Sequence, residues 1–230
     1  LGVRRQRQMC IRDRLYLMRY FKSLSLLILL ISGFVYGQSS KQSIWADSSF
    51  SGLKFRSIGP AFMSGRISDI AIHPDNESVW YVTVGSGNVW KTTNAGVTWT
   101  PIFDDQPSYS IGCVTIDPNN SNTIWIGTGE NLGGRHFGYG DGVYKSENGG
   151  KSWTNMGLKK SEHISEVLVH PKDPNTVWVA SQGPMWSSGG ERGVYKSVDG
   201  GKNWSLVLKS NKWTGATELK MDPRNPNRLY

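Results

Sequence analysis

The chain contains almost no cysteine. Only Cys10 and Cys113 occur among its 230 residues, and Cys10 lies in an N-terminal segment that we expect the mature protein to lack. One remaining cysteine excludes a disulfide framework within the mature chain. Cys113 stands in the apolar stretch GCVTI, where we expect a small buried side chain.

The spacings of histidine and cysteine that are typical of metal sites are also missing. His73 and His170 each precede a proline in equivalent copies of a repeat, so we interpret them as features of that repeat. The sequence therefore predicts neither a metal site nor a cofactor.

No apolar run is long enough to span a bilayer. The longest run, residues 24–36, is shorter than the roughly 20 residues that a transmembrane helix needs. It follows the basic stretch MRYFK, which begins at Met18, and small residues precede Gln38. This is the layout of a cleaved secretory signal peptide over residues 18–37. We expect an exported protein, in the periplasm, at the cell surface or outside the cell, without a stable membrane span after cleavage.

The chain has little excess of either charge once its N-terminus is set aside. The formal net charge of the whole chain is +8, but residues 1–37 hold seven of the 26 Lys and Arg and one of the 18 Asp and Glu. The remainder has 26 − 7 = 19 basic and 18 − 1 = 17 acidic residues, a net charge of +2. A balance this close to neutral gives no electrostatic basis for binding nucleic acid, so we expect no nucleic-acid partner.

The chain does contain one turn sequence that occurs three times. The copies are TTNAGVTW at residues 92–99, SENGGKSW at 146–153 and SVDGGKNW at 197–204, which begin 54 and then 51 residues apart. A period of this length indicates a solenoid, an array or a propeller. A second ladder, IHPDNESVWYV, IDPNNSNTIWIG, VHPKDPNTVWVA and MDPRNPNRLY, reads each time as strand, polar turn with proline, and strand.

The residue types of the repeated turn predict its geometry. Ser or Thr, with Asn or Asp two places on, can accept hydrogen bonds from the local backbone, and Gly can adopt the positive φ of a tight turn. The tryptophan then opens the next strand with a large apolar surface. We assign structural roles to Thr92, Asn94, Gly96, Trp99, Ser146, Asn148, Gly150, Trp153, Ser197, Asp199, Gly201 and Trp204.

Four short strands per repeat predict an all-β fold, a β-propeller of four-stranded antiparallel blades. We expect blades at about residues 65–103, 111–158 and 164–209, and the start of a fourth at 214–230. The repeats would follow a doubtful extension (1–17), the signal peptide and a linker (38–52). Because the chain stops within a strand pattern, we expect an incomplete N-terminal fragment of the ring.

The turn resembles the Asp-box of bacterial neuraminidase (BNR) repeats, and residues 53–230 resemble the sortilin (Vps10)-like family of bacterial secreted propellers. The stretches FRSIGPAFMSGRISDIAIHP, WIGTGENLGG, YGDGVYKSENGGKSW and SQGPMWSSGGERGVYKS carry the likeness. The resemblance implies the fold but not an activity, because Asp-boxes occur in hydrolases, receptors and other propellers.

Departures from the repeat indicate where a ligand would bind. The loop between the second and third strands is only GSG in the first blade, but grows to GENLGGRHFGYGD at residues 129–141 and SQGPMWSSGGER at 181–192. Long loops on a regular scaffold often carry binding residues. The candidates on this face are Arg66, Tyr109, Glu130, Arg135, His136, Tyr139, Asp141, His163, Trp186, Glu191 and Arg192.

Each candidate also has a structural interpretation. Arg135 and Arg192 could pair with Glu130 or Glu191 to hold the loops, and Asp141 could simply form a turn. The two aromatic side chains, Tyr139 and Trp186, could stack on a sugar, pack a peptide or hold the loops together.

We favour a binding or scaffold module of the sortilin type, with a peptide, protein or glycan as ligand. The alternative is a glycoside hydrolase, sialidase-like or xyloglucanase-like, and a purely structural envelope protein is a third interpretation. Glycosidases use two carboxylates at a set separation, and no spacing in this sequence selects a pair. The first-blade loop at residues 85–87 lacks the acid that xyloglucanase-like enzymes carry there.

Overall fold

A computed structural model of the chain describes residues 66–131 and 138–230. These residues belong to the second of two compact units, Leu1–Ser57 and Ile58–Tyr230. The expected signal peptide and linker lie outside the described residues, and exported location stays a prediction. The part that the structure describes contains no helix with the length and apolar character to cross a membrane.

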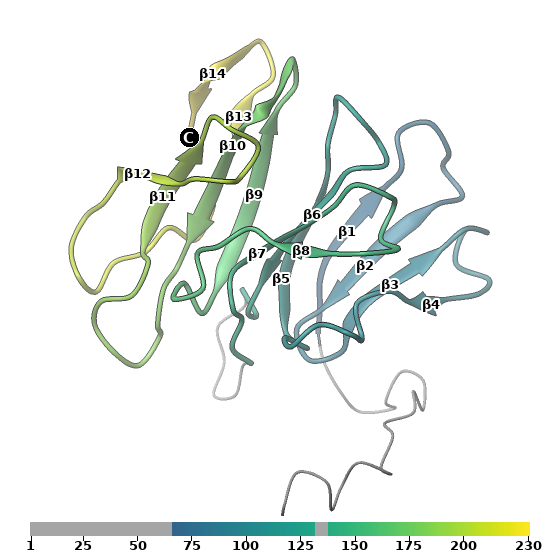
Figure 1. Cartoon of the computed structure of the whole chain (residues 1–230), viewed down its shortest axis with the longest axis horizontal. Helices are drawn as coiled ribbons and strands as arrows, with labels where there is room; N and C mark the ends of the chain where they lie inside the picture. The colour runs from purple at the N-terminus through teal and green to yellow at the C-terminus, as the bar shows by residue number, and fades with distance from the viewer. Residues whose placement is uncertain (1–65, 132–137) are drawn as a thin grey trace, which may run out of the picture. The chain divides into compact units, whose positions relative to one another are not determined.

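The described residues form three four-stranded antiparallel sheets, each with its strands in chain order (Figure 1). This confirms the all-β fold of four-stranded blades. The outer strands of the first two sheets are short, since only two residues of β4 and of β8 pair with their neighbours. The strands of the three sheets are β1 (Ile67–Ile72), β2 (Trp80–Val84), β3 (Asn88–Thr92), β4 (Thr100–Pro101), β5 (Ile111–Ile116), β6 (Ile124–Thr128), β7 (Val143–Ser146), β8 (Thr154–Asn155), β9 (Ile164–His170), β10 (Asp173–Ser181), β11 (Gly193–Ser197) and β12 (Ser205–Leu208).

A two-stranded sheet follows the third blade. It pairs β13 (Met221–Asp222) with β14 (Asn225–Leu229), as the fourth copy of the proline-containing ladder predicts. Met221 and Leu229 of this hairpin pack against a core cluster that contains Trp178, Ala180 and Val194 of the third sheet, so the hairpin continues the same stacking.

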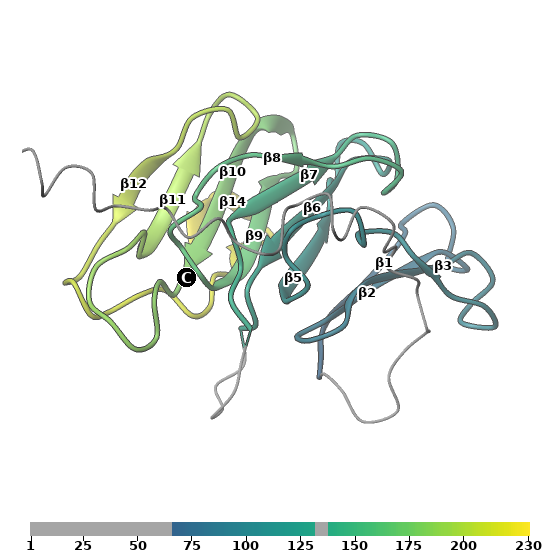
Figure 2. The same cartoon turned by 60° about the horizontal axis from the view of Figure 1, so that its bottom comes forward.

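The cores lie between successive sheets, and the first strand of each sheet lies beside the first strand of the next (Figures 1 and 2). Tyr81 and Val89 of the first sheet share a core with Ile111 and Ile126 of the second. Residues of the second and third sheets form a further core around Trp125, which is fully buried. Each blade thus buries an apolar face on its neighbour, as expected of a propeller.

The repeated turns adopt the predicted geometry. In the third copy, the Ser197 hydroxyl donates to Asp199 and accepts from the Gly201 N–H at 2.8 Å, and the Asp199 carboxylate accepts from the Asn203 N–H. The first two copies repeat these bonds through Thr92 and Ser146. The three turn glycines, Gly96, Gly150 and Gly201, have φ of 89°, 89° and 90°. The turn residues therefore do the structural work expected of them.

The tryptophans after the turns join one blade to the previous one. The indole N–H of Trp153 donates to the Ile102 carbonyl, and that of Trp204 to the Met156 carbonyl, each at 2.7 Å. A lysine also links neighbouring blades, because the Lys91 ammonium lies over the Tyr81 ring and donates to the Gly149 carbonyl of the next blade.

Candidate functional site

The loops that break the repeat lie together at one end of the sheets. We call this end the rim: the β2–β3, β6–β7 and β10–β11 loops and the connections between blades. Contacts between its segments show the convergence, since the Ser110 hydroxyl donates to the carbonyls of Gly85 and Gly138, at 2.6 and 3.0 Å. The Gln182 side-chain amide donates to the Asn131 carbonyl at 3.1 Å.

Glu130 is buried at the junction of the first two blades. Its side chain is 1% exposed and forms an ion pair with Arg66, whose Nε lies 2.6 Å from the same carboxylate oxygen. Gly85 leaves the room for this carboxylate, because a Cβ there would stand 2.7 Å from Glu130 Cδ. Among the described residues, the ion-pair partner of Glu130 is Arg66. In this state the carboxylate holds two blades together and is shielded from solvent.

His163 occupies the equivalent junction between the second and third blades. It is fully buried, and its Nδ1 lies 3.0 Å from the Glu130 carbonyl. Because a carbonyl only accepts, Nδ1 carries the proton in this contact. Burial lowers the pKa of this imidazole. His163 thus lies behind the rim surface as a neutral ring.

The other rim carboxylates also have partners. Asp141 accepts from the Tyr144 hydroxyl at 2.6 Å, and burial together with this bond raises the pKa of Tyr144 to about 12. Glu191 accepts from the Lys160 N–H at 2.7 Å. Asp141 and Glu191 therefore both make direct contacts within the protein, which is the type of role that their structural interpretation proposes.

Arg192 holds its loop, but not through Glu191. The guanidinium lies almost wholly buried among backbone carbonyls, and its Nε and Nη1 donate to Gly189 and Gln182 at 2.8 Å. Arg192 therefore holds the loop through backbone carbonyls, whereas the sequence suggested pairing with an acidic side chain.

Several of the exposed side chains of the rim are aromatic, beside exposed charged residues such as Asp105, Lys159 and Lys212. Tyr109 is 58% exposed, Tyr139 57% and Trp186 70%, all three being sequence candidates. The structure adds Trp213, which is 60% exposed in the connection after β12 and was missed by sequence reasoning. The sequence feature that could have identified Trp213 is that this tryptophan does not follow a repeated turn. Arg135 and His136, the remaining candidates, lie outside the described residues.

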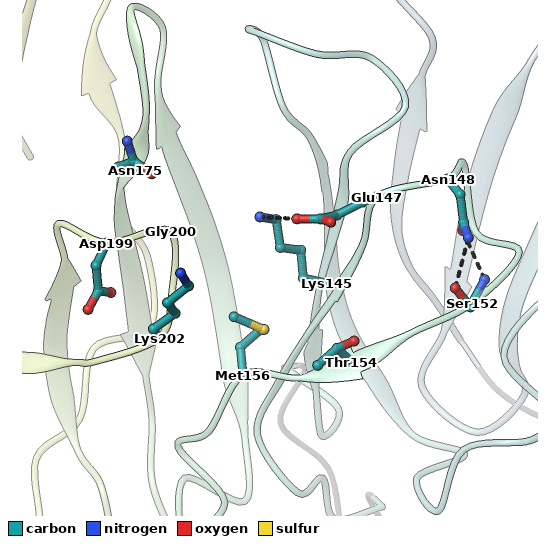
Figure 3. Close-up of a pocket in the computed structure, with 10 residues that line it drawn as sticks. All are labelled: Lys145, Glu147, Asn148, Ser152, Thr154, Met156, Asn175, Asp199, Gly200 and Lys202. Carbon is teal, nitrogen blue, oxygen red and sulfur yellow. Dashed lines mark hydrogen bonds and ion pairs between the residues drawn. The ribbon is translucent and has the colours of Figure 1, made fainter.

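A cavity of about 520 Å³ opens at the opposite, Asp-box end, between the repeated turns of the second and third sheets (Figure 3). The cavity lies where Lys145 of the second sheet pairs with Glu147 at 2.8 Å. The equivalent lysine of the first sheet, Lys91, instead donates to the Gly149 carbonyl of the next turn. The other acid in its wall, Asp199, is occupied by its own turn, whose bonds lower the pKa to about 2. The cavity is a gap between structural turns.

Metal chemistry has no visible site in residues 66–131 and 138–230. No group of three or more His, Cys, Asp or Glu side chains there could hold a metal ion. The buried cysteine, Cys113, lies in the core between the second and third sheets, and burial raises the pKa of its thiol.

No family model matches the chain. The oligoxyloglucan-reducing end-specific xyloglucanase of Emericella nidulans is 22% identical over 178 residues, covering 74% of this chain and 20% of the enzyme. The xyloglucanase of Hypocrea jecorina is 24% identical over 226 residues, covering 86% of this chain and 26% of the enzyme. Among solved structures, the GH74 enzyme of Niastella koreensis has a TM-score of 0.54 and 26% identity, over 70% of this chain and 24% of that one.

These similarities change the balance between the functional interpretations. The relatives are xyloglucanases and a GH74 enzyme, so they support a glycoside hydrolase better than a scaffold, and the sortilin-type assignment finds no support among them. The chain spans only about a fifth to a quarter of the length of these proteins.

Proposed function

We propose that this chain is the polysaccharide-binding part of a glycoside hydrolase that acts on a neutral glycan of the xyloglucan type. One observation carries the proposal. The described rim exposes aromatic rings, while Glu130, Asp141, Glu191 and Arg192 are bonded within the protein. Aromatic rings present flat apolar faces that can stack on the C–H faces of pyranose rings without requiring charge on the ligand.

The same feature argues against a charged ligand. A sialidase-like site would need cationic side chains available for a sugar carboxylate, and the described arginines of the rim have partners. Arg66 pairs with Glu130, and Arg192 bonds carbonyls. These two arginines are therefore engaged within the protein, whereas a sialidase-like site would present arginine to the sugar carboxylate.

Cleavage requires more than this surface supplies. Glycosidases use an acid and a second carboxylate, and among the described rim residues Glu130, Asp141 and Glu191 are already engaged. We therefore assign substrate binding to the described residues and expect the reacting carboxylates outside them.

Affinity electrophoresis tests the proposal. The full-length protein should be retarded in gels that contain xyloglucan but not in gels with an anionic polysaccharide, and should release reducing sugar from xyloglucan. Tyr109→Ala and Tyr139→Ala should each weaken binding several-fold, as loss of one aromatic contact of about 1 kcal/mol predicts. The matched control is Val198→Ala, which shortens an exposed apolar side chain at the Asp-box end. Binding to sialylated glycans or peptides, with none to neutral polysaccharides, would contradict the proposal.

A further inference from the structure

The β10–β11 loop is folded around a single guanidinium. Arg192 has five N–H donors, and each has a carbonyl within reach. Nε bonds Gly189, Nη1 bonds Gln182 and Trp213, and Nη2 bonds Pro184 and Ser187. A buried cation with all its donors satisfied fixes the path of the backbone that supplies the carbonyls.

Close packing tightens the loop further. Gly183, at φ +73°, lies against the Arg192 side chain, where a Cβ would stand 2.2 Å from Cγ. The Gly189 N–H donates to the Lys212 carbonyl at 2.8 Å. The loop is thereby fastened to the connection after β12 by this bond and by the bond from Arg192 to the Trp213 carbonyl at 3.1 Å.

This rigid frame carries two largely exposed tryptophans. Trp186 lies between Pro184 and Ser187, whose carbonyls bond Arg192, and its side chain is 70% exposed. The Trp213 carbonyl bonds the same guanidinium while its side chain is 60% exposed. Large aromatic side chains are normally the most buried part of a loop, and two held outward on an ordered backbone are typical of a binding surface. Ordering the loop before the ligand arrives lowers the entropic cost of binding.

We propose that Trp186 and Trp213 together form a stacking platform for pyranose rings of a neutral polysaccharide, and that Arg192 is the positioning residue that sets the two indoles relative to each other. This rests on the proposed function and extends it to a defined pair of side chains. Arg192 directs all its donors into the protein, so it builds the platform without presenting its charge to the ligand.

Titration calorimetry with xyloglucan oligosaccharides tests the platform. Trp186→Ala and Trp213→Ala should each weaken binding by about tenfold, the upper part of the range for one aromatic contact. Lys209→Ala is the matched control, because it removes an exposed charge from the same connection and should leave affinity unchanged. An equal loss in the control, or full affinity in the double tryptophan variant, would overturn the platform.

Arg192→Lys separates positioning from folding. Lysine keeps the charge but has three donors on a flexible stem, so the loop should loosen and affinity should fall several-fold. In the Trp186→Ala/Trp213→Ala background the same change should produce no further loss, because there is no platform left to position. A loss that is equally large in both backgrounds would show a general effect on folding and refute the positioning role.

The two proposals can fail separately. If the protein cleaves xyloglucan while the double tryptophan variant retains affinity and KM, the platform is wrong and the proposed function stands. If the wild-type protein neither binds nor cleaves any neutral polysaccharide, both are wrong.

Discussion

His163 is fully buried, although an imidazole can carry charge near neutral pH. Its Nδ1–H bonds the Glu130 carbonyl, and Tyr139 covers it with ring centroids 5.7 Å apart. Glu130 in turn is buried and pairs with Arg66, whose side chain is half exposed. At the scale of single residues, these groups support the exposed rim from behind.

The lowered pKa of His163 predicts a pH dependence of stability. The folded state binds this proton less readily than the unfolded state, in which the pKa is near 6.5. The stability that His163 contributes is therefore fully present above pH 6.5, and the free energy of unfolding should fall as the pH drops below this value. Urea titrations at pH 7.5 and 5.5 measure the difference.

His163→Asn should be less stable at pH 7.5 but should lose less of its stability on acidification than the wild type does. An unchanged difference between the two pH values would contradict the assignment of this slope to His163.

At the scale of elements, the repeated turn is a unit built from sequence neighbours. Its bonds run between residues two to four places apart, as from Gly201 to Ser197 and from Asn203 to Asp199. The sequence therefore predicted it well. The long loops behave differently, because the carbonyls around Arg192 include that of Trp213, 21 residues away. No spacing rule identified this contact, and Trp213 was missed for that reason.

Ser197→Ala tests the turn. The Ser197 hydroxyl is buried and accepts the Gly201 N–H, so its loss leaves a buried donor unsatisfied and should cost about 1–3 kcal/mol. Ser197→Thr should be tolerated, because Thr92 makes the same bond in the first copy. Chemical denaturation provides the measurement, and equal stability of the two variants would count against the turn as a stabilising element.

At the scale of the molecule, blades are joined by apolar cores and by hydrogen bonds that cross from one blade to the next. The Trp153 and Trp204 indoles both donate to the outer edge of the previous blade. Lys91 and Tyr81 reach the Gly149 carbonyl of the following turn. Such contacts between neighbouring repeats supply much of the stability of repeat proteins.

Trp204→Phe should weaken the junction of the second and third blades. The change keeps an aromatic ring but removes the bond to Met156, so the free energy of unfolding should fall by about 1 kcal/mol, with some loss of packing in addition. Lys202→Ala, on the exposed part of the same turn, serves as the control. Hydrogen exchange should show faster opening of β11 and β12 in Trp204→Phe, and unchanged exchange there would contradict this role.

The sequence by itself determined the repeat, the turn geometry and the four-stranded sheets, because these depend on residues close together in the chain. It also located the rim, since the loops that depart from the repeat are visible as insertions. Only the tertiary structure decided which rim residues face solvent. Arg66 and Glu130 are 64 positions apart, and their pairing buries a carboxylate that the sequence presented as a ligand candidate. Burial depends on contacts between distant segments, and these contacts enclose Glu130 and Arg192 while several aromatic rings of the rim stay exposed.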